Sequence, residues 1–238
     1  MATYILFWNP AISSYTMERF QEDFEERVCV GNWSIYEHDD VEYGDIFYMV
    51  RCGEGKTGIV MRGEITSECY EDHDWSPKKR KHIFYADIEA SVTIHPETAS
   101  VMLTPDVLTE KLPDFDWYGG HSGRRLSDEY AKKLDEIWFE YINSNPQLFS
   151  SNQAFIDDYQ ELLMGDEIKS SLHEQVGNKC EVCGYDYESV FGDDAKKEKM
   201  VMPLEYIVSP NLKRLVYAVC QNCRQASDEV LAKKLNGK

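Results

Sequence analysis

Two Cys-x-x-Cys pairs constrain the fold of this chain more than any other feature of its sequence. Cys180 and Cys183 form the first pair, and 36 residues separate it from the second pair, Cys220 and Cys223. The tight turn within each pair points two sulfurs the same way, and four thiolates suit tetrahedral Zn²⁺. Such a closed site holds a structural zinc that helps a small domain to fold. A redox pair and unrelated thiols are the alternatives, but neither explains two pairs followed by a helical pattern.

The net charge is strongly negative and is confined to one part of the chain. Of the 238 residues, 43 are acidic and 25 are basic, which gives a formal charge of -18. Residues 1–173 carry 33 acidic and 15 basic side chains, whereas residues 174–238 carry 10 of each. Loose, sequence-blind binding to nucleic acid depends on a surplus of Lys and Arg, so this balance argues against it. It does not exclude a local basic site.

The apolar content excludes disorder as the main state, because 42% of the residues are hydrophobic. No run approaches the roughly 18 apolar residues that a membrane helix needs. The first nine residues lack the basic start and the small-residue cleavage site of a signal peptide. We therefore expect a cytoplasmic protein.

Segments rich in β-branched and aromatic residues dominate the first half of the chain. Strands are predicted over residues 4–8, 32–36, 45–51, 57–67 and 84–94, and helices over 14–27, 105–111 and 127–141. The later strands lie too close together for intervening helices, which favours a mostly antiparallel sheet that curls into a barrel. The predicted fold class is α+β, with a barrel and peripheral helices over 1–142, a helical connector over 143–176 and a small zinc domain over 177–238.

The residues around the cysteine pairs form an ordered series. Gly184-Tyr185-Asp186-Tyr187 follows the first pair, a Pro203-Leu204 step lies further on, and Val219 precedes the second pair. This series resembles the zinc-bearing form of the HNH endonuclease fold. The resemblance implies a treble-clef, ββα arrangement around the metal, in a domain that cuts nucleic acid.

The histidines of that family are missing here. Lys199 and Met200 stand where two histidines are expected, Arg224 stands where a later one is expected, and the family's asparagine position falls near Leu215. The last histidine of the chain is His173. HNH chemistry needs an imidazole as base and a second metal ion, so we expect a retained scaffold without a nuclease centre and assign no catalytic residue. An active nuclease would need a new carboxylate metal site built from Asp193, Asp194, Glu198 and Glu205.

A second resemblance covers residues 4–142. Its segments are Asn32-Trp33-Ser34, Gly44-Asp45 before a strand, the run from Gly58 to Glu68, Tyr70-Glu71-Asp72 with Trp75, and Trp117 followed by His121-Ser122-Gly123 and Leu126. As an ordered set they resemble the EVE family of PUA-like barrels, which is related to the YTH readers of methylated RNA. Fusion of such a barrel to an HNH domain implies a protein that restricts DNA carrying modified cytosine, as in phage defence.

This resemblance implies a pocket for a base that is flipped out of the nucleic acid stack. Such a pocket needs aromatic faces to replace the lost stacking and polar groups to read the base edge. We expect Trp33 and Trp117 as its walls, with Ser34, Ser122 and Gly123 at the base edge. Packing in the core is the alternative role for both tryptophans. Candidates to replace either wall are Tyr85, Tyr118 and Trp75.

Two basic clusters stand out from the acidic background. Lys78, Lys79 and Arg80 lie in a polar stretch, and Arg124 and Arg125 follow the His-Ser-Gly segment. We expect them to contact phosphate, which positions a strand but carries no sequence information. Solvated loops are the plain alternative.

Three classes of function follow. The first is a protein that binds a modified base through the barrel, with modified cytosine in DNA as the main expected ligand and RNA as another. The second is an active HNH-type endonuclease that uses other residues. The third is an acidic interaction protein without a nucleic acid ligand. The first class is the working hypothesis.

Overall fold

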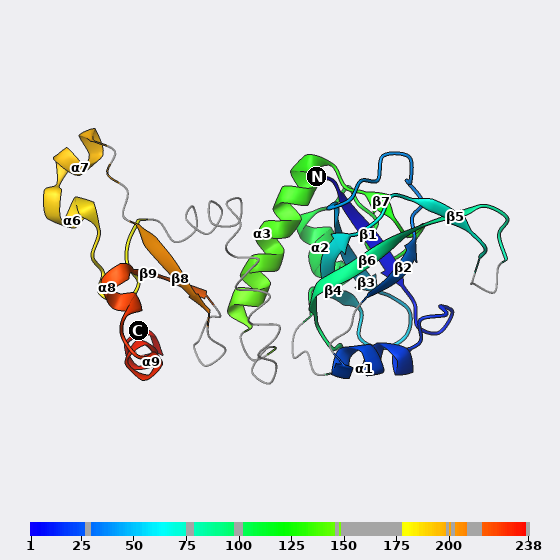
Figure 1. Cartoon of the computed structure of the whole chain (residues 1–238), viewed down its shortest axis with the longest axis horizontal. Helices are drawn as coiled ribbons and strands as arrows, with labels where there is room; N and C mark the ends of the chain where they lie inside the picture. Colours follow the sequence, from blue (N-terminus) through cyan, green and yellow to red (C-terminus); the bar gives the residue numbers. More distant parts are fainter. Residues whose placement is uncertain are drawn as a thin grey trace. The chain divides into compact units, whose positions relative to one another are not determined.

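The protein is described by a computed structural model, and the chain divides into two units, residues 1–138 and 139–238 (Figure 1). The predicted connector over 143–176 lies almost entirely outside the described residues and stays a prediction. The structure describes residues 1–26, 30–74, 79–97, 102–145, 148, 178–198, 200, 203–208 and 216–236.

The first unit contains a curled sheet of seven strands, which confirms the α+β class (Figure 1). The strand order is β2-β6-β4-β3-β1-β7, and β5 pairs with β6. β1 runs parallel to β3, and the other pairs are antiparallel. The five predicted strands are confirmed, and two short strands, β5 and β7, join them. The strands are β1 Thr3–Trp8, β2 Val30–Ser34, β3 Ile46–Arg51, β4 Gly58–Ile65, β5 Tyr70–Asp72, β6 Ile83–Thr93 and β7 Arg124–Arg125.

Three helices cover this sheet, close to their predicted bounds. They are α1 Met17–Glu26, α2 Pro105–Lys111 and α3 Asp128–Ser144. α1 lies at one end of the sheet, and α2 and α3 lie along one side (Figure 1). α2 begins at Thr104, whose hydroxyl accepts from the Val107 amide, and Pro105 suits the first helical position. No helix in the described part of the chain combines the length and the apolarity of a membrane span.

A buried polar cluster joins α3 to the sheet. Arg62 on β4 is 4% exposed, and its guanidinium lies 3.3 Å from the Asp135 carboxylate. The Tyr48 hydroxyl on β3 donates to the same carboxylate, and the Tyr48 ring meets Trp138 edge-on with centroids 5.7 Å apart. A buried charge needs such a partner, because loss of one member leaves the other uncompensated. This cluster fixes the helix against β3 and β4.

The two ends of the curled sheet meet at a seam, formed by residues 35–37 and 122–123. The Tyr36 amide donates to the Ser122 carbonyl at 2.9 Å, and the Glu37 amide donates to the Gly123 carbonyl at 3.0 Å. The Gly123 amide donates in turn to the Ile5 carbonyl of β1 at 2.9 Å. These bonds link the chain after β2 to the chain before β7. They therefore stabilise the curled shape of the sheet by joining its two ends.

The second unit has its own small core, built on a β-hairpin and short helices (Figure 1). Its elements are α6 Tyr187–Phe191, α7 Asp193–Lys197, β8 Leu204–Val208, β9 Val216–Cys220, α8 Gln221–Arg224 and α9 Asp228–Asn236. Cys180 and Cys220 belong to the core, together with Val219, Leu231 and Leu235. The helical pattern that follows the second cysteine pair in the sequence forms α9. The apolar cluster that the described residues form here is small, and a small core needs a further source of stability.

Buried tyrosines predict a loss of stability at alkaline pH. Burial, with Asp45 nearby, raises the pKa of Tyr4 to about 12, and burial raises the pKa of Tyr48 well above its ordinary value. The folded protein therefore keeps protons that unfolded tyrosines release above pH of about 10. We expect the contribution of these tyrosines to the unfolding free energy to be fully present below that pH and to fall as pH rises from about 10 toward 12. Denaturant titrations of the full chain at several pH values measure this.

The Tyr4→Phe variant measures how much Tyr4 alone contributes to the loss of stability at alkaline pH. The Tyr4 hydroxyl is buried and has no hydrogen-bond partner among the described residues, so its removal exposes no orphaned group. We expect the variant to be at least as stable as the wild type at neutral pH and to lose less stability above pH of about 10. Tyr43→Phe is the matched control, because Tyr43 is 75% exposed. Identical alkaline profiles for Tyr4→Phe and the wild type would contradict the prediction.

Candidate functional site

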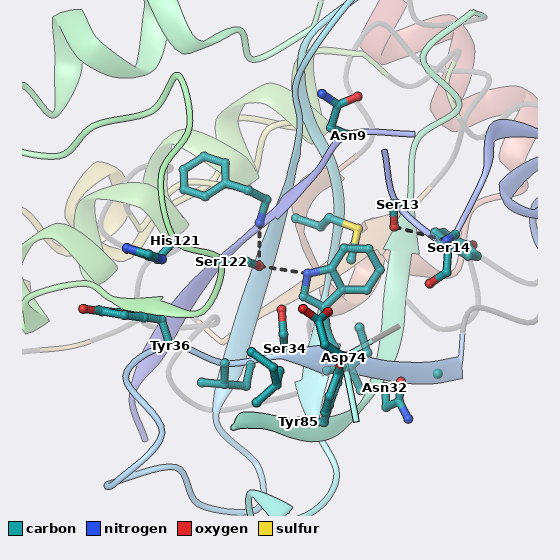
Figure 2. A pocket seen from close by; sticks show the side chains of 18 of the residues that line it. Asn9, Ser13, Ser14, Asn32, Ser34, Tyr36, Asp74, Tyr85, His121 and Ser122 are labelled. Atoms are coloured by element: carbon teal, nitrogen blue, oxygen red, sulfur yellow. Dashed lines mark hydrogen bonds between the residues drawn. The ribbon is translucent and has the colours of Figure 1, made fainter. Parts of the chain in front are cut away.

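A cavity of about 1100 Å³ opens in the first unit (Figure 2). Its lining comes mainly from β2 and residues 35–38, the loop that follows β1, α1, the chain between β5 and β6, β6 itself, and residues 119–122. Its size lies at the upper end of the range for small-molecule sites, which leaves room for a base together with part of its sugar and phosphate.

Trp33 on β2 forms a wall of this cavity and is held in one orientation. Its indole N–H donates to the Ser122 hydroxyl oxygen at 2.8 Å, and that oxygen also accepts from the Phe7 amide at 2.9 Å (Figure 2). Tyr15 meets the Trp33 ring edge-on, with centroids 6.1 Å apart. The side chain is half-buried. Because its single polar atom is already bonded, the apolar body of the ring is what the cavity offers to a ligand.

Polar groups lie around the cavity with the tryptophan (Figure 2). Asp74 is 3% exposed, and its Oδ2 accepts from the Arg80 amide at 2.7 Å and from Arg80 Nε at 3.0 Å. Ser34, at the end of β2, is half-buried, and its hydroxyl has no hydrogen-bond partner within the described residues. Tyr85 on β6 is 6% exposed and donates to the His73 carbonyl at 3.3 Å. The cavity therefore combines a fixed aromatic wall with a carboxylate and a hydroxyl.

Two of the predicted base-binding residues lie outside this cavity. Trp117 is fully buried, packs against Phe115 and donates its indole N–H to the Leu112 carbonyl at 3.0 Å. Gly123 belongs to the seam, where both its amide and its carbonyl are already bonded. This placement differs from the sequence prediction for both residues. Trp33, Ser34 and Ser122 are the three predicted base-binding residues that the fold brings together.

The three aromatic residues suggested as alternatives to the tryptophan walls lie in different places. Tyr85 lines the cavity. Tyr118 is 59% exposed and its hydroxyl donates to the Asp106 carboxylate, outside the cavity lining. Trp75 lies outside the described residues. Tyr85 is thus the alternative aromatic that the described structure places at the site.

The first basic cluster reaches the cavity through one side chain. Arg80 lines it and pairs with the buried Asp74. The Lys79 ammonium donates to the Asp74 carbonyl at 3.4 Å, outside the cavity lining. Lys78 lies outside the described residues. The side chain of Arg80 is 46% exposed, so it remains accessible to a phosphate at the rim.

The second basic cluster lies on β7 and is engaged within the protein. Arg124 lies over the Phe115 ring, 4.5 Å from its centroid. Arg125 lies 3.8 Å from the Asp128 carboxylate, and its amide donates to the Glu37 carboxylate at 3.0 Å. Neither arginine lines the cavity. Contact of these two residues with phosphate stays a prediction.

Tyr15, Tyr36, Asp74 and His121 are among the lining residues that sequence reasoning missed. Asp74 lies in a polar stretch that carries no periodic pattern, and Tyr15 lies in a loop. Position 121 adjoins Ser122 in the segment that carried the resemblance, and Tyr36 adjoins the end of β2. Proximity to predicted site residues was the signal that could have found these two.

The four cysteines of the second unit lie close enough to share one metal ion. Their sulfurs all lie within 4.8 Å of one another, and those of Cys183 and Cys220 are 3.9 Å apart. Tetrahedral zinc with bonds of about 2.3 Å places its sulfurs about 3.8 Å apart, so the set fits this metal. Burial raises the pKa of Cys180, but the backbone amides of Cys183, Cys220 and Val182 outweigh it and lower the pKa to about 7. This favours the thiolate at Cys180, whereas burial and the neighbouring cysteines raise the pKa of Cys183 and of Cys223.

A carboxylate metal site is not assembled in the described part of the chain, where the four cysteines are the group that could hold a metal. Asp194 lies 3.3 Å from Lys197, and Glu205 lies 3.9 Å from Arg224. Asp193 is exposed. Lys199 and Leu215, which replace family residues, lie outside the described residues.

No protein-family profile matches the chain, and no curated protein matches it. Three similar solved structures have TM-scores below 0.5. A hypothetical protein from Leishmania major has a TM-score of 0.43 and 10% identity, over 59% of this chain and 96% of that one. A structural-genomics protein from Pseudomonas syringae has 0.40 and 16%, over 57% and 99%. The YTH domain of the Zygosaccharomyces rouxii MRB1 protein, solved with N6-methyladenosine RNA, has 0.33 and 12%, over 57% and 86%. At this level the similarity carries no argument about function.

Proposed function

We propose that the first unit binds a modified base, flipped out of nucleic acid, in the cavity beside Trp33. The observation that carries this proposal is the fixed, half-buried indole in the wall of a cavity of about 1100 Å³. Stacking of a base on an aromatic ring contributes about 1 to 3 kcal/mol. Flipping costs a few kcal/mol, so this contact offsets much of the cost.

The polar groups of the cavity favour a base with an amino group. The Asp74 carboxylate lines the cavity, and an ionised carboxylate acts only as a hydrogen-bond acceptor. The exocyclic amines of cytosine and adenine are donors that match it. The resemblance to modified-cytosine readers selects modified cytosine in DNA from these two, and methylated RNA is the competing ligand for the test.

The negative charge of the chain is consistent with a protein that recognises the base in its cavity and gains little affinity from phosphate contacts. Residues 1–173 carry 33 acidic and 15 basic side chains. The described arginines of the two basic clusters already have protein partners. Non-specific affinity depends on cations that neutralise phosphates, so it is expected to be weak here. A protein of this kind depends on the modified base itself.

The second unit is proposed to hold one structural Zn²⁺ through Cys180, Cys183, Cys220 and Cys223 and to have no nuclease centre. The sulfur spacing supports zinc, and the absence of histidine after position 173 argues against HNH chemistry. When bound, the ion would cross-link the two Cys-x-x-Cys segments and leave no open position for water.

Trp33→Ala tests the reader function. We expect it to lower the affinity for the preferred modified probe by about five- to 150-fold, which corresponds to the loss of one stacking contact. The measurement is binding at fixed salt to matched duplexes that carry cytosine, 5-methylcytosine or 5-hydroxymethylcytosine, and to RNA with or without N6-methyladenosine. Tyr118→Ala is the control, because it removes an exposed aromatic ring outside the cavity.

Two outcomes would overturn the reader function. One is that no modified probe binds more tightly than its unmodified partner. The other is that a folded Trp33→Ala protein binds as the wild type does. Magnesium or manganese added in parallel tests for cutting, and cleavage that is lost in Asp193→Ala would support an active nuclease instead.

A further inference from the structure

Two stacked rings border the cavity and have no part in the contacts described above. The rings of Tyr36 and His121 lie parallel, with centroids 4.1 Å apart and an angle of 9° between their planes (Figure 2). Tyr36 is 57% exposed, and His121 is exposed as well. Both line the cavity. An aromatic pair this open to water buries little apolar area, so core packing does not explain it.

The seam holds this pair in place relative to Trp33. The Tyr36 amide donates to the Ser122 carbonyl, and the hydroxyl of the same Ser122 accepts from the Trp33 indole. His121 is the residue immediately before Ser122. One short segment therefore positions both the cavity wall and the stacked pair. Neither needs to be ordered by a ligand, which reduces the entropic cost of binding.

The surroundings of the pair suit a base better than a phosphate. Glu37, Asp39 and Asp40 follow Tyr36 in the sequence, and acidic groups repel an anionic backbone. A flat, exposed aromatic ring accepts any base face, because every base has a π-face. In a strand whose flipped base enters the cavity, the adjoining nucleotide loses a stacking partner and must find another surface.

We propose that Tyr36 and His121 form a stacking platform for the nucleotide next to the base in the cavity, so that the ligand is a strand and not a free nucleotide. This inference rests on the proposed function, because the platform matters only if the cavity holds a base. It adds a second, sequence-tolerant contact to the contact at Trp33.

The test compares wild type, Tyr36→Ala and Tyr36→Phe with three probes that share one modified base. The base is whichever of 5-methylcytosine, 5-hydroxymethylcytosine and N6-methyladenine the wild type binds. The probes are its nucleoside monophosphate, a short single strand with that base at the centre, and the same strand with abasic sites on both sides. Strands of DNA and of RNA are both used. Binding is measured at fixed salt.

We expect the wild type to bind the intact strand about five- to 150-fold more tightly than the abasic-flanked strand, which is the effect of one stacked base. Tyr36→Ala is expected to abolish this difference, so that it binds the intact and the abasic-flanked strands with the same affinity. Tyr36→Phe keeps the ring and should behave as the wild type.

Each contrary result has a distinct meaning. If Tyr36→Ala retains the wild-type preference for the intact strand while Trp33→Ala loses binding, the platform is refuted and the base cavity stands. If the wild type binds none of the probes, or if Trp33→Ala binds as the wild type does, the proposed function and the platform both fail.

Discussion

Removal of zinc is expected to unfold the second unit and to leave the first unit folded. The core of the second unit includes two of the four cysteines, so the cysteine cluster and the apolar cluster form one structure. Structural zinc contributes apparent binding free energies of about 10 to 16 kcal/mol in small domains at neutral pH. This is comparable to or larger than the whole stability of most domains, which is about 5 to 15 kcal/mol.

The tryptophans make the two units separately observable. All five precede residue 139, so tryptophan fluorescence reports on the first unit alone. We expect one zinc ion per chain by elemental analysis, and we expect a chelator or Cys220→Ser to abolish amide protection in the second unit. The fluorescence melting curve should not change. Cys52→Ser is the matched control, because Cys52 is half-buried in the first unit.

Two results would count against the structural zinc. The first is a chain purified without metal that keeps the same hydrogen-exchange protection in the second unit. The second is a Cys220→Ser protein that binds zinc with the stoichiometry and the affinity of the wild type.

Gly123→Ala is expected to destabilise the first unit by about 2 to 5 kcal/mol. Gly123 has a φ of +78°, a left-handed conformation that costs other residues about 1 to 2 kcal/mol. A Cβ there would clash with the Ile35 Cα and would lie 2.8 Å from the Tyr36 amide nitrogen, and neither backbone atom can rotate away. Overpacking of this kind costs a further 1 to 3 kcal/mol or so. Denaturant unfolding followed by tryptophan fluorescence measures the effect.

Gly31→Ala is the control for this substitution. Gly31 lies in β2 and does not have a positive φ, and a Cβ added to it would meet no heavy atom within 4 Å. Its replacement should change the unfolding free energy by less than about 1 kcal/mol. Equal effects of the two substitutions would refute the role assigned to the seam.

Local patterns were sufficient to predict most of the first unit. β1 after Thr3 and β3 up to Val50 are continuous apolar runs, and both strands are buried along their whole length. The two-residue strand β7 escaped prediction because Arg124 and Arg125 carry no apolar period. The parallel pairing of β1 with β3 could not be predicted either. It joins segments about 40 residues apart, and no local sequence signal specifies which strands pair.

The sequence predicted both Trp33 and Trp117 at the base site, but of the two the structure places only Trp33 at the cavity. The two residues look alike in sequence, and their roles depend on where each indole N–H finds an acceptor. Trp117 finds the Leu112 carbonyl, just past the end of α2, where a helix leaves carbonyls without intrahelical partners. Trp33 finds the Ser122 hydroxyl beside the cavity. Only the folded chain distinguishes these two outcomes.

The position of β1 within the sheet bears on how the protein is made. β1 lies between β3 and β7, and Phe7 bonds to Ser122, 115 residues further along the chain. On the ribosome, one edge of this apolar strand therefore waits without its partner until the β7 segment has emerged. Unpaired strands of this kind are prone to aggregate, and such distant pairings fold slowly. Slower translation between β3 and β7 would prolong that exposure, whereas the cysteines of the second unit emerge after the sheet can close.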